Sequence, residues 1–222
     1  MAATLTIDIE EDFPPYLNTN KGVEGIKKIK ELAGSKKLTA FVCADFLAEN
    51  PQILDYAKGW EFGCHGLRHV DYAKLPHDKV KSELEKSLEI FSEYGIKPKG
   101  FRAPYASVNE TVLSVVAGLF EYDSSLGFFS RAKPPEGLKE LPIFLGGKAL
   151  GINPALFSVL MKMPVKNKVF FVHPWEVAGV EFSEIEKRRR IMKPFGYSRE
   201  NYIINIKKVL NDFKPLSELM QK

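Results

Sequence analysis

The stretch Leu5-Thr6-Ile7-Asp8-Ile9 decides the fold, because it has the pattern of a buried strand that stops abruptly. An acidic cluster at residues 10–12 and the breaker Pro14-Pro15 follow it directly. Apolar residues then recur at helical spacing over residues 22–32, and residues 39–42 return to a strand pattern. This strand–helix–strand order indicates a parallel α/β sheet.

The same alternation continues along the rest of the chain. Further strands are predicted at residues 60–64, 100–101, 119–123, 138–145 and 168–172, and further helices at residues 51–57, 78–94, 110–117 and 202–213. About seven parallel strands in a chain of this length fit a distorted (β/α) barrel. Because no linker, repeat or low-complexity tract interrupts the pattern, we expect a single domain over residues 1–222.

Composition and charge exclude several classes of partner. The chain has 222 residues, and its 32 basic and 28 acidic residues leave a net charge of +4, so we expect no nucleic-acid partner. The densest basic run, residues 187–193, follows three glutamates and is interpreted as a solvated helix face. Cys43 and Cys64 have neither metal-type nor disulfide spacing and are expected to be buried thiols.

Hydropathy predicts no integral membrane segment, because no apolar run reaches membrane-spanning length. The N-terminus also lacks the charged and apolar regions of a signal peptide. We therefore expect a cytoplasmic protein by default, although a chain whose export signal had been removed would look the same. The sequence makes no prediction of oligomeric state.

Polar residues close almost every predicted strand, and five of them carry chemistry that an enzyme could use: Asp8, His65, Arg102, Asp123 and His173. The carboxyl ends of parallel strands meet at one edge of the sheet, where α/β proteins collect their functional groups. These five side chains are therefore predicted to lie in one site.

His65 and His69 form the clearest local motif, Phe62-Gly63-Cys64-His65-Gly66-Leu67-Arg68-His69. A spacing of four residues lets a helical turn or a tight loop aim both imidazoles at one point. Neutral imidazole is a common ligand of zinc, which in catalytic sites has three protein ligands and one open position. The alternative is a pair of histidines held by hydrogen bonds at a strand end.

Five segments in order resemble the motifs of the NodB-type polysaccharide deacetylases, carbohydrate esterase family 4. They are Thr6-Ile7-Asp8-Ile9-Glu10, His65-Gly66-Leu67-Arg68-His69, Gly100-Phe101-Arg102-Ala103-Pro104-Tyr105, Asp123-Ser124-Ser125-Leu126 and Val172-His173-Pro174-Trp175-Glu176. The resemblance implies a distorted (β/α) barrel and a catalytic domain that spans the chain. It also implies a metal-dependent hydrolase that removes N-acetyl groups from amino sugars, as in chitin or peptidoglycan.

The resemblance implies a role for each motif residue. Asp8 would be the catalytic base, His65 and His69 metal ligands, Arg102 the group that holds the base, His173 the general acid, Asp123 the carboxylate that sets the charge of His173, and Tyr105 a backbone donor to the oxyanion beside the substrate. The implied cofactor is a divalent ion, zinc first, with cobalt, manganese and nickel as other candidates.

The chain departs from the family pattern in its first motif, where two adjacent aspartates are usual. Here Ile9 follows Asp8, so the third metal ligand must come from elsewhere. Residues i and i+2 share a face of a strand, which makes Glu10 the expected ligand. Asp12 is the alternative.

Two further departures concern the rim of the site. Gly66 stands where many members have Ser or Thr, and no tryptophan follows the Asp123 motif, so Trp175 is expected to supply a wall beside the substrate. Aromatic residues that could stack on a sugar are Tyr16, Tyr72, Tyr105, Phe128, Phe129 and Trp175.

The predicted function is a metal-dependent deacetylase that acts on an N-acetylated carbohydrate or another amide. Two alternatives remain at this level: a catalytically silent member of the same fold that binds a sugar or acyl ligand, and a metal-free amidohydrolase.

Overall fold

The structure is a computed structural model that describes residues 2–11, 21–179 and 198–220. At its centre lies an all-parallel sheet of eight strands in the order β6-β5-β4-β3-β2-β1-β8-β7. The strands are β1 (Ala2–Ile9), β2 (Thr39–Val42), β3 (Glu61–Cys64), β4 (Gly100–Phe101), β5 (Tyr122–Asp123), β6 (Lys139–Glu140), β7 (Ile143–Gly146) and β8 (Asn167–Val172). The predicted parallel α/β class is therefore confirmed.

The stretch that opens the chain forms the longest strand and lies inside the sheet. β1 pairs with β2 on one side and with β8 on the other, so that Thr6 lies between Thr39 and Phe171. Leu5, Ile7 and Ile9 are fully buried. A strand covered on both faces needs the continuous apolar run that this segment supplies.

The sheet curls into a half-barrel, and two strands that are consecutive in the sequence lie at its two opposite edges. The strand predicted at residues 138–145 is divided by Leu141-Pro142 into β6 and β7. β6 pairs with β5 at one edge of the sheet, and β7 pairs with β8 at the other. Proline has no N–H to continue a ladder, which explains the break. The count is accordingly eight strands where the pattern predicts about seven.

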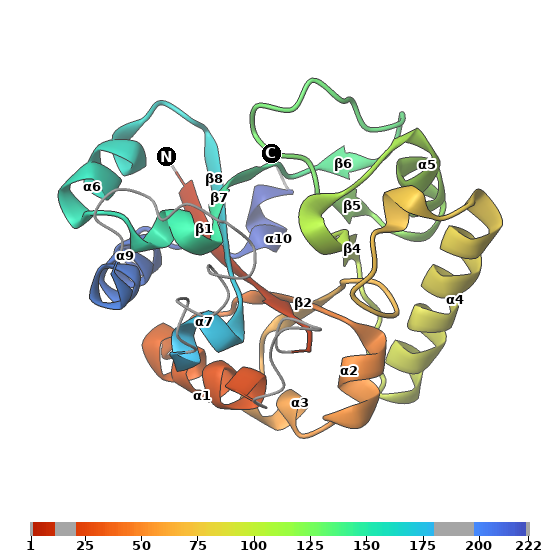
Figure 1. Cartoon of the computed structure of the whole chain (residues 1–222), viewed down its shortest axis with the longest axis horizontal. Coiled ribbons are helices and arrows are strands. Elements are labelled where there is room, and N and C mark those ends of the chain that lie inside the picture. The colour runs from red at the N-terminus through yellow and green to blue at the C-terminus, as the bar shows by residue number, and fades with distance from the viewer. Residues whose placement is uncertain (1, 12–20, 180–197, 221–222) are drawn as a thin grey trace.

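The helices surround the strands, with α4 and α5 on one side of the molecule and α6 and α9 on the opposite side (Figure 1). Their bounds are α1 (Lys21–Ala33), α2 (Ala44–Glu49), α3 (Ile53–Tyr56), α4 (His77–Glu93), α5 (Glu110–Leu119), α6 (Pro154–Lys162), α7 (Pro174–Ala178), α9 (Arg199–Asn211) and α10 (Leu216–Leu219). Short 3-10 turns lie at Tyr72–Lys74, Pro104–Ala106 and Gly147–Gly151.

The amphipathic helices are placed as their apolar spacing predicts. Ile26 and Ile29 of α1 and Val80 and Leu84 of α4 are buried against the sheet layer. The prediction was wrong at the end of α5, which continues to Leu119 and leaves only Tyr122–Asp123 as strand. The short helices α2, α7 and α10 were not predicted, and neither was α6.

A second, smaller cluster of buried residues lies away from the main core. It consists of Phe41, Tyr122, Leu141 and Val169 from the strand region together with Leu216 and Leu219 of α10. These residues come from both flanks of the curled sheet, so α10 closes the hollow that the curl creates. The main cluster fills the layer between the strands and the surrounding helices.

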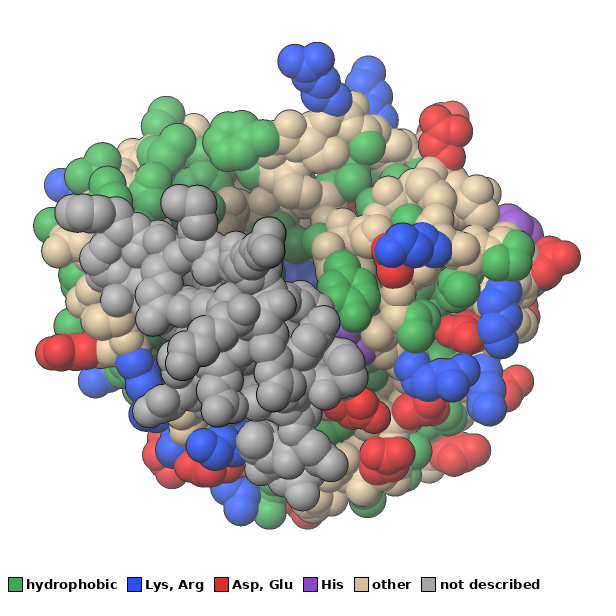
Figure 2. Space-filling model, in the orientation of Figure 1, with side chains coloured by type: hydrophobic (Ala, Val, Ile, Leu, Met, Phe, Trp, Pro, Cys, Tyr) green, Lys and Arg blue, Asp and Glu red, His purple; other side chains and the backbone are tan. Residues whose placement is uncertain are grey.

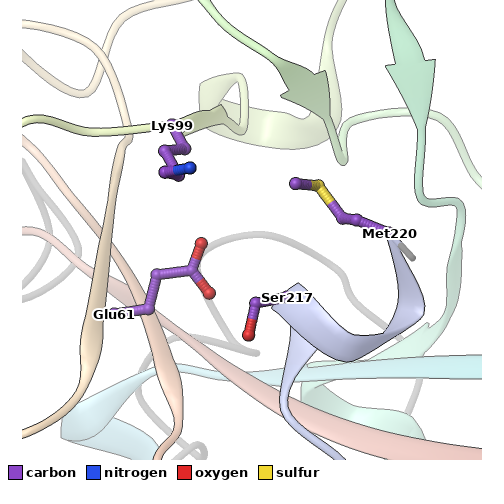
Figure 3. Close-up of a pocket in the computed structure, with 4 residues that line it drawn as sticks. All are labelled: Glu61, Lys99, Ser217 and Met220. Atoms are coloured by element: carbon purple, nitrogen blue, oxygen red, sulfur yellow. The ribbon is translucent and has the colours of Figure 1, made fainter.

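A depression of about 470 Å³ lies beside α10, at the amino ends of the strands (Figure 3). Its lining is Glu61, Lys99, Ser217 and Met220. Glu61 accepts hydrogen bonds from Tyr122 and Thr39, both at 3.0 Å, and Lys99 pairs with Glu121 at 3.2 Å. The charged groups of this depression are thus engaged in holding neighbouring strands and loops together.

Several sequence predictions concern the surface and the thiols. Cys43 and Cys64 are free and buried as predicted, and burial raises the pKa of Cys64 to about 12. Among the described residues, no helix has the length and hydropathy needed to cross a membrane. Hydrophobic side chains gather over α6 in Figure 2, where Leu156 and Val159 are exposed. The basic run at 187–193 lies outside the described residues.

Candidate metal and acid–base site

The carboxyl ends of β4, β3, β1 and β8, on both sides of β2, open onto one cavity of about 230 Å³. Its lining is Asp8, Glu10, His65, His69, Arg102, Ala103, Tyr105, Ala106, Ile143, Phe171 and His173. The cavity contains seven of the residues that the sequence singled out. Asp123 and Trp175 do not line it, and Asp12 and Tyr16 lie outside the described residues.

Glu10, His65 and His69 converge at the floor of this cavity. Glu10 follows β1 directly and its side chain is 1% exposed. Its Oε2 atom lies 2.5 Å from His69 Nε2 and 3.4 Å from His65 Nε2. One ligand atom from each of the three residues lies within 4.8 Å of the others, which is a spacing that a metal ion can bridge.

The environment of His65 fixes which ring nitrogen faces Glu10. His65 Nδ1 lies 2.7 Å from the carbonyl oxygen of Arg102. A carbonyl only accepts, so Nδ1 donates to it, and Nε2 is the ring nitrogen that faces Glu10 and could bind an ion. Metal-binding histidines are held in the same way, by a carbonyl or carboxylate on the other ring nitrogen.

Glu10 provides an independent test of whether a cation fits. Burial by itself raises the pKa of Glu10, but hydrogen bonds and charge from His65, His69 and His173 outweigh it and hold the pKa well below its ordinary value. Its buried Oε2 nevertheless has no hydrogen bond of acceptable geometry among the described residues. A buried carboxylate oxygen left in this way, close to Nε2 of both His65 and His69, fits a divalent cation.

Arg102 binds Asp8, and its other N–H groups donate hydrogen bonds to buried partners. The guanidinium donates to Asp8 Oδ1 and to Thr6 Oγ1, both at 2.7 Å, and to the backbone oxygen and Oγ of Ser124, both at 2.8 Å. Its carbon lies 4.3 Å from the ring centroid of Phe41. A fully buried charge needs this degree of pairing, and the arrangement holds Asp8 in one orientation.

His173 lies on the other side of Glu10, directly before α7. Its Nε2 is 3.7 Å from Glu10 Oε1, and its Nδ1 is 3.2 Å from Glu176 Oε2. Burial alone lowers the pKa of His173, but the charge and hydrogen bond of Glu176, with Glu10 and Asp8, raise it to about 9. The imidazolium form that a general acid requires is therefore favoured at neutral pH.

Asp123 does not have the partner that was predicted for it. The fully buried carboxylate accepts from the backbone N–H of Ser125 at 2.9 Å and from Ser125 Oγ at 2.7 Å, because the chain turns back immediately after β5. It also lies against Glu140. The described carboxylates in contact with His173 are Glu176 and Glu10, so the expectation that Asp123 sets the charge of His173 is corrected.

Trp175 is also placed differently from the prediction. It is 3% exposed, and its ring stacks on His173 with centroids 4.8 Å apart and planes at 18°. It supports His173 from behind and forms no wall of the cavity. Tyr105 does line the cavity: it is half-exposed, and its ring centroid lies 4.3 Å from that of His69.

Gly66 is explained by the close approach of Tyr72. Its φ of +87° lies in the left-handed region, and a Cβ placed there would be 2.7 Å from the Tyr72 ring. The Tyr72 hydroxyl accepts the Leu67 N–H at 2.8 Å and so fixes the loop between the two histidines. Tyr72 is fully buried and is no sugar platform, whereas Phe128 and Phe129 are exposed.

Comparison with known proteins finds a family match over part of the chain. Residues 33–119 match the family model described as polysaccharide deacetylase. The uncharacterized protein YlxY of Bacillus subtilis (strain 168) is 33% identical over 84 residues, which are 36% of this chain and 26% of YlxY. The aligned part is thus about a quarter of that relative.

Three solved structures share the fold over nearly the whole chain. A family 4 carbohydrate esterase from Streptomyces lividans, in complex with acetate, aligns with a TM-score of 0.55 and 18% identity over 95% of this chain and 86% of its own. The Bc1960 peptidoglycan N-acetylglucosamine deacetylase gives 0.60 and 16%, over 99% and 87%. BA3943 from Bacillus anthracis, a pseudoenzyme of the same family, gives 0.61 and 15%, over 99% and 66%.

The match over residues 33–119 includes β3, His65 and His69, and the fold likeness extends to the strands that carry Asp8 and His173. The resemblance drawn from five sequence motifs is thereby confirmed to this extent: residues 33–119 match the polysaccharide deacetylase model, and the fold of the chain is that of solved structures from carbohydrate esterase family 4.

Proposed function

We propose that the protein is a metal-dependent hydrolase that removes N-acetyl groups from an amino sugar within an oligosaccharide or polysaccharide. The observation that carries the proposal is the convergence of Glu10, His65 and His69 beside Asp8 and His173 in one cavity. The family match supports an acetylated carbohydrate as substrate.

Each residue of the cavity has a separate role in amide hydrolysis. A divalent ion at Glu10, His65 and His69, zinc first, would polarise the acetyl carbonyl and acidify water. Asp8, held by Arg102, takes the proton of the attacking water. His173 delivers a proton to the amine nitrogen as the C–N bond breaks, since an unprotonated amine is a poor leaving group. The backbone N–H of Tyr105 is the proposed donor to the oxyanion.

Metal content and two variants test the proposal. We expect about one divalent ion per chain by elemental analysis, as for a site with three protein ligands. His65→Ala should lose both the ion and acetate release from N-acetylglucosamine oligomers. Asp8→Asn should keep the ion and lose activity, because it removes the base without touching a ligand. His77→Ala, on an exposed histidine of α4, is the matched control and should change neither.

The altered first motif supports a second candidate, a silent relative that binds an acylated sugar without hydrolysing it. Glu10 takes the place of an aspartate adjacent to the base, and one structure of similar fold is a pseudoenzyme. Acetate release from any N-acetylated oligosaccharide, lost in Asp8→Asn, would remove this candidate. A metal-free mechanism would instead keep full activity after exhaustive chelation, and the position of Glu10 between His65 and His69 argues against it.

A further inference from the structure

His173 is held by a carboxylate three residues further along the chain. Glu176 belongs to α7, is 3% exposed, and places Oε2 at 3.2 Å from His173 Nδ1. The same oxygen accepts the backbone N–H of His173 at 2.9 Å. Glu176 therefore accepts a hydrogen bond from the main chain of His173 and lies at ion-pair distance from its ring.

Glu176 is itself anchored from a distant part of the chain. The Tyr202 hydroxyl of α9 donates to Glu176 Oε2 at 2.5 Å, and Tyr202 is 1% exposed. Because the carboxylate is buried and accepts from a fixed phenol, it has little freedom to move away from His173.

These contacts decide which nitrogen of His173 can serve the substrate. Nδ1 faces Glu176, and the stacked Trp175 restricts rotation of the ring. Nε2 is left on the side of Glu10 and the cavity, 3.7 Å from Glu10 Oε1. A proton donor to a leaving amine must present its N–H in that direction.

We propose that Glu176 is the positioning residue of the proton donor in this chain, in the part that the family resemblance implies for Asp123. The inference rests on the proposed function, because it concerns the step in which the amine leaves. In that step water adds its oxygen to the acetyl carbon, the C–N bond breaks, and the proton from His173 Nε2 ends on the amine nitrogen. Glu176 acts through His173 and does not touch the substrate.

Two substrates with different leaving groups separate this role from a structural one. An N-acetylated amino-sugar oligomer releases an amine that needs protonation, whereas 4-nitrophenyl acetate releases a phenolate that does not. In Glu176→Gln, we expect kcat for the amide to fall at least about tenfold with KM within about threefold. Hydrolysis of the ester should stay within about twofold of the wild type.

Three further variants complete the experiment. Glu176→Asp keeps the charge and should recover part of the amide activity. Asp123→Asn should leave the ratio of amide to ester rates unchanged, since Asp123 is bonded to Ser125. Glu176→Gln should add little to the loss already present in His173→Ala, because both act on one proton transfer.

The possible outcomes distinguish a failure of this inference from a failure of the proposed function. If the wild type hydrolyses neither substrate, the proposed function fails and the inference fails with it. If the wild type is active and Glu176→Gln lowers both rates equally while its melting temperature is unchanged, Glu176 has no special link to the proton donor. If Asp123→Asn changes the ratio of amide to ester rates and Glu176→Gln does not, Asp123 and not Glu176 positions the proton donor.

Discussion

Glu140 holds a proton at neutral pH because of where it is buried. Burial, together with the neighbouring Asp123, raises the pKa of Glu140 to about 10, and Glu140 Oε2 has no other hydrogen-bond partner among the described residues. Protonated Glu140 can donate to Asp123, and Asp123 in turn orients Ser125, which accepts the Ala103 N–H beside Arg102. Glu140 and Asp123, which share one proton, thus help to hold Ala103 in the wall of the cavity.

Replacing Glu140 with Gln should remove a pH-dependent loss of stability. The pKa of Glu140 in the folded protein lies above the unfolded value of 4.5. Its stabilising contribution to the free energy of unfolding is therefore fully present below about pH 4.5 and is lost as the pH rises toward 10. One proton corresponds to a slope of about 1.4 kcal/mol per pH unit. Urea unfolding between pH 6 and 9 should show a shallower decline for Glu140→Gln than for the wild type. The exposed Glu136→Gln is the control, and equal slopes for all three proteins would contradict the assignment.

The residues that could be predicted from the sequence share one property, a place at the end of a strand. Asp8, His65 and His173 were found in this way, and Glu10 followed from the two-residue repeat of a strand. Thr6 was missed because its bond to Arg102 joins residues 96 positions apart, which only strand order reveals. Glu176 was in the quoted motif, but only the turn into α7 shows that its carboxylate reaches His173.

At the scale of elements, α5 depends on the residue that precedes it, Asn109. Asn109 accepts the Val112 N–H at 3.0 Å as an N-cap, and its amide donates to Ala73 at 2.9 Å, which ties α5 to the loop after His69.

Asn109→Ala should destabilise the protein by about 0.5–2 kcal/mol, since it removes the N-cap. Asn109→Asp keeps the cap oxygen and loses the bond to Ala73, so it should restore most of the difference. Thermal or urea unfolding of the three proteins measures both values. Equal losses in the two variants would mean that the tie to Ala73, and not the cap, carries the effect.

Elements with strong periodicity were predictable, and those set by tertiary pairing were not. α1 and α4 have one apolar and one charged face, and both were found. Residues 154–162 of α6 are apolar around most of the helix, so the sequence shows no separate apolar face that would have identified the helix. The division at Pro142 follows from which neighbours the two halves meet, β5 and β8, and no local pattern specifies them.

At the scale of the whole molecule, a bound ion would join two parts of the sheet. Glu10 follows β1, whereas His65 and His69 follow β3, and β2 lies between these strands. The three ligands come together only in the folded chain, so binding adds to the free energy of unfolding.

Chelation should therefore lower the melting temperature. Free metal at about 100 times its Kd stabilises a protein by about 2.7 kcal/mol, which corresponds to about 5–10 °C for a chain of this size. Differential scanning fluorimetry before and after dialysis against EDTA measures the shift. His65→Ala should not respond to chelation, and a wild type that does not respond would argue against an ion at Glu10, His65 and His69.

The contact between Gly66 and Tyr72 has an evolutionary consequence. Because the ring occupies the space of a side chain at position 66, a change from Gly to Ser or Thr there would collide with it. A smaller residue at position 72 would have to arise first, and that change would loosen the loop while glycine remained. Positions 66 and 72 should therefore covary among descendants of this chain. Epistasis between these two buried positions constrains the order in which the substitutions can occur.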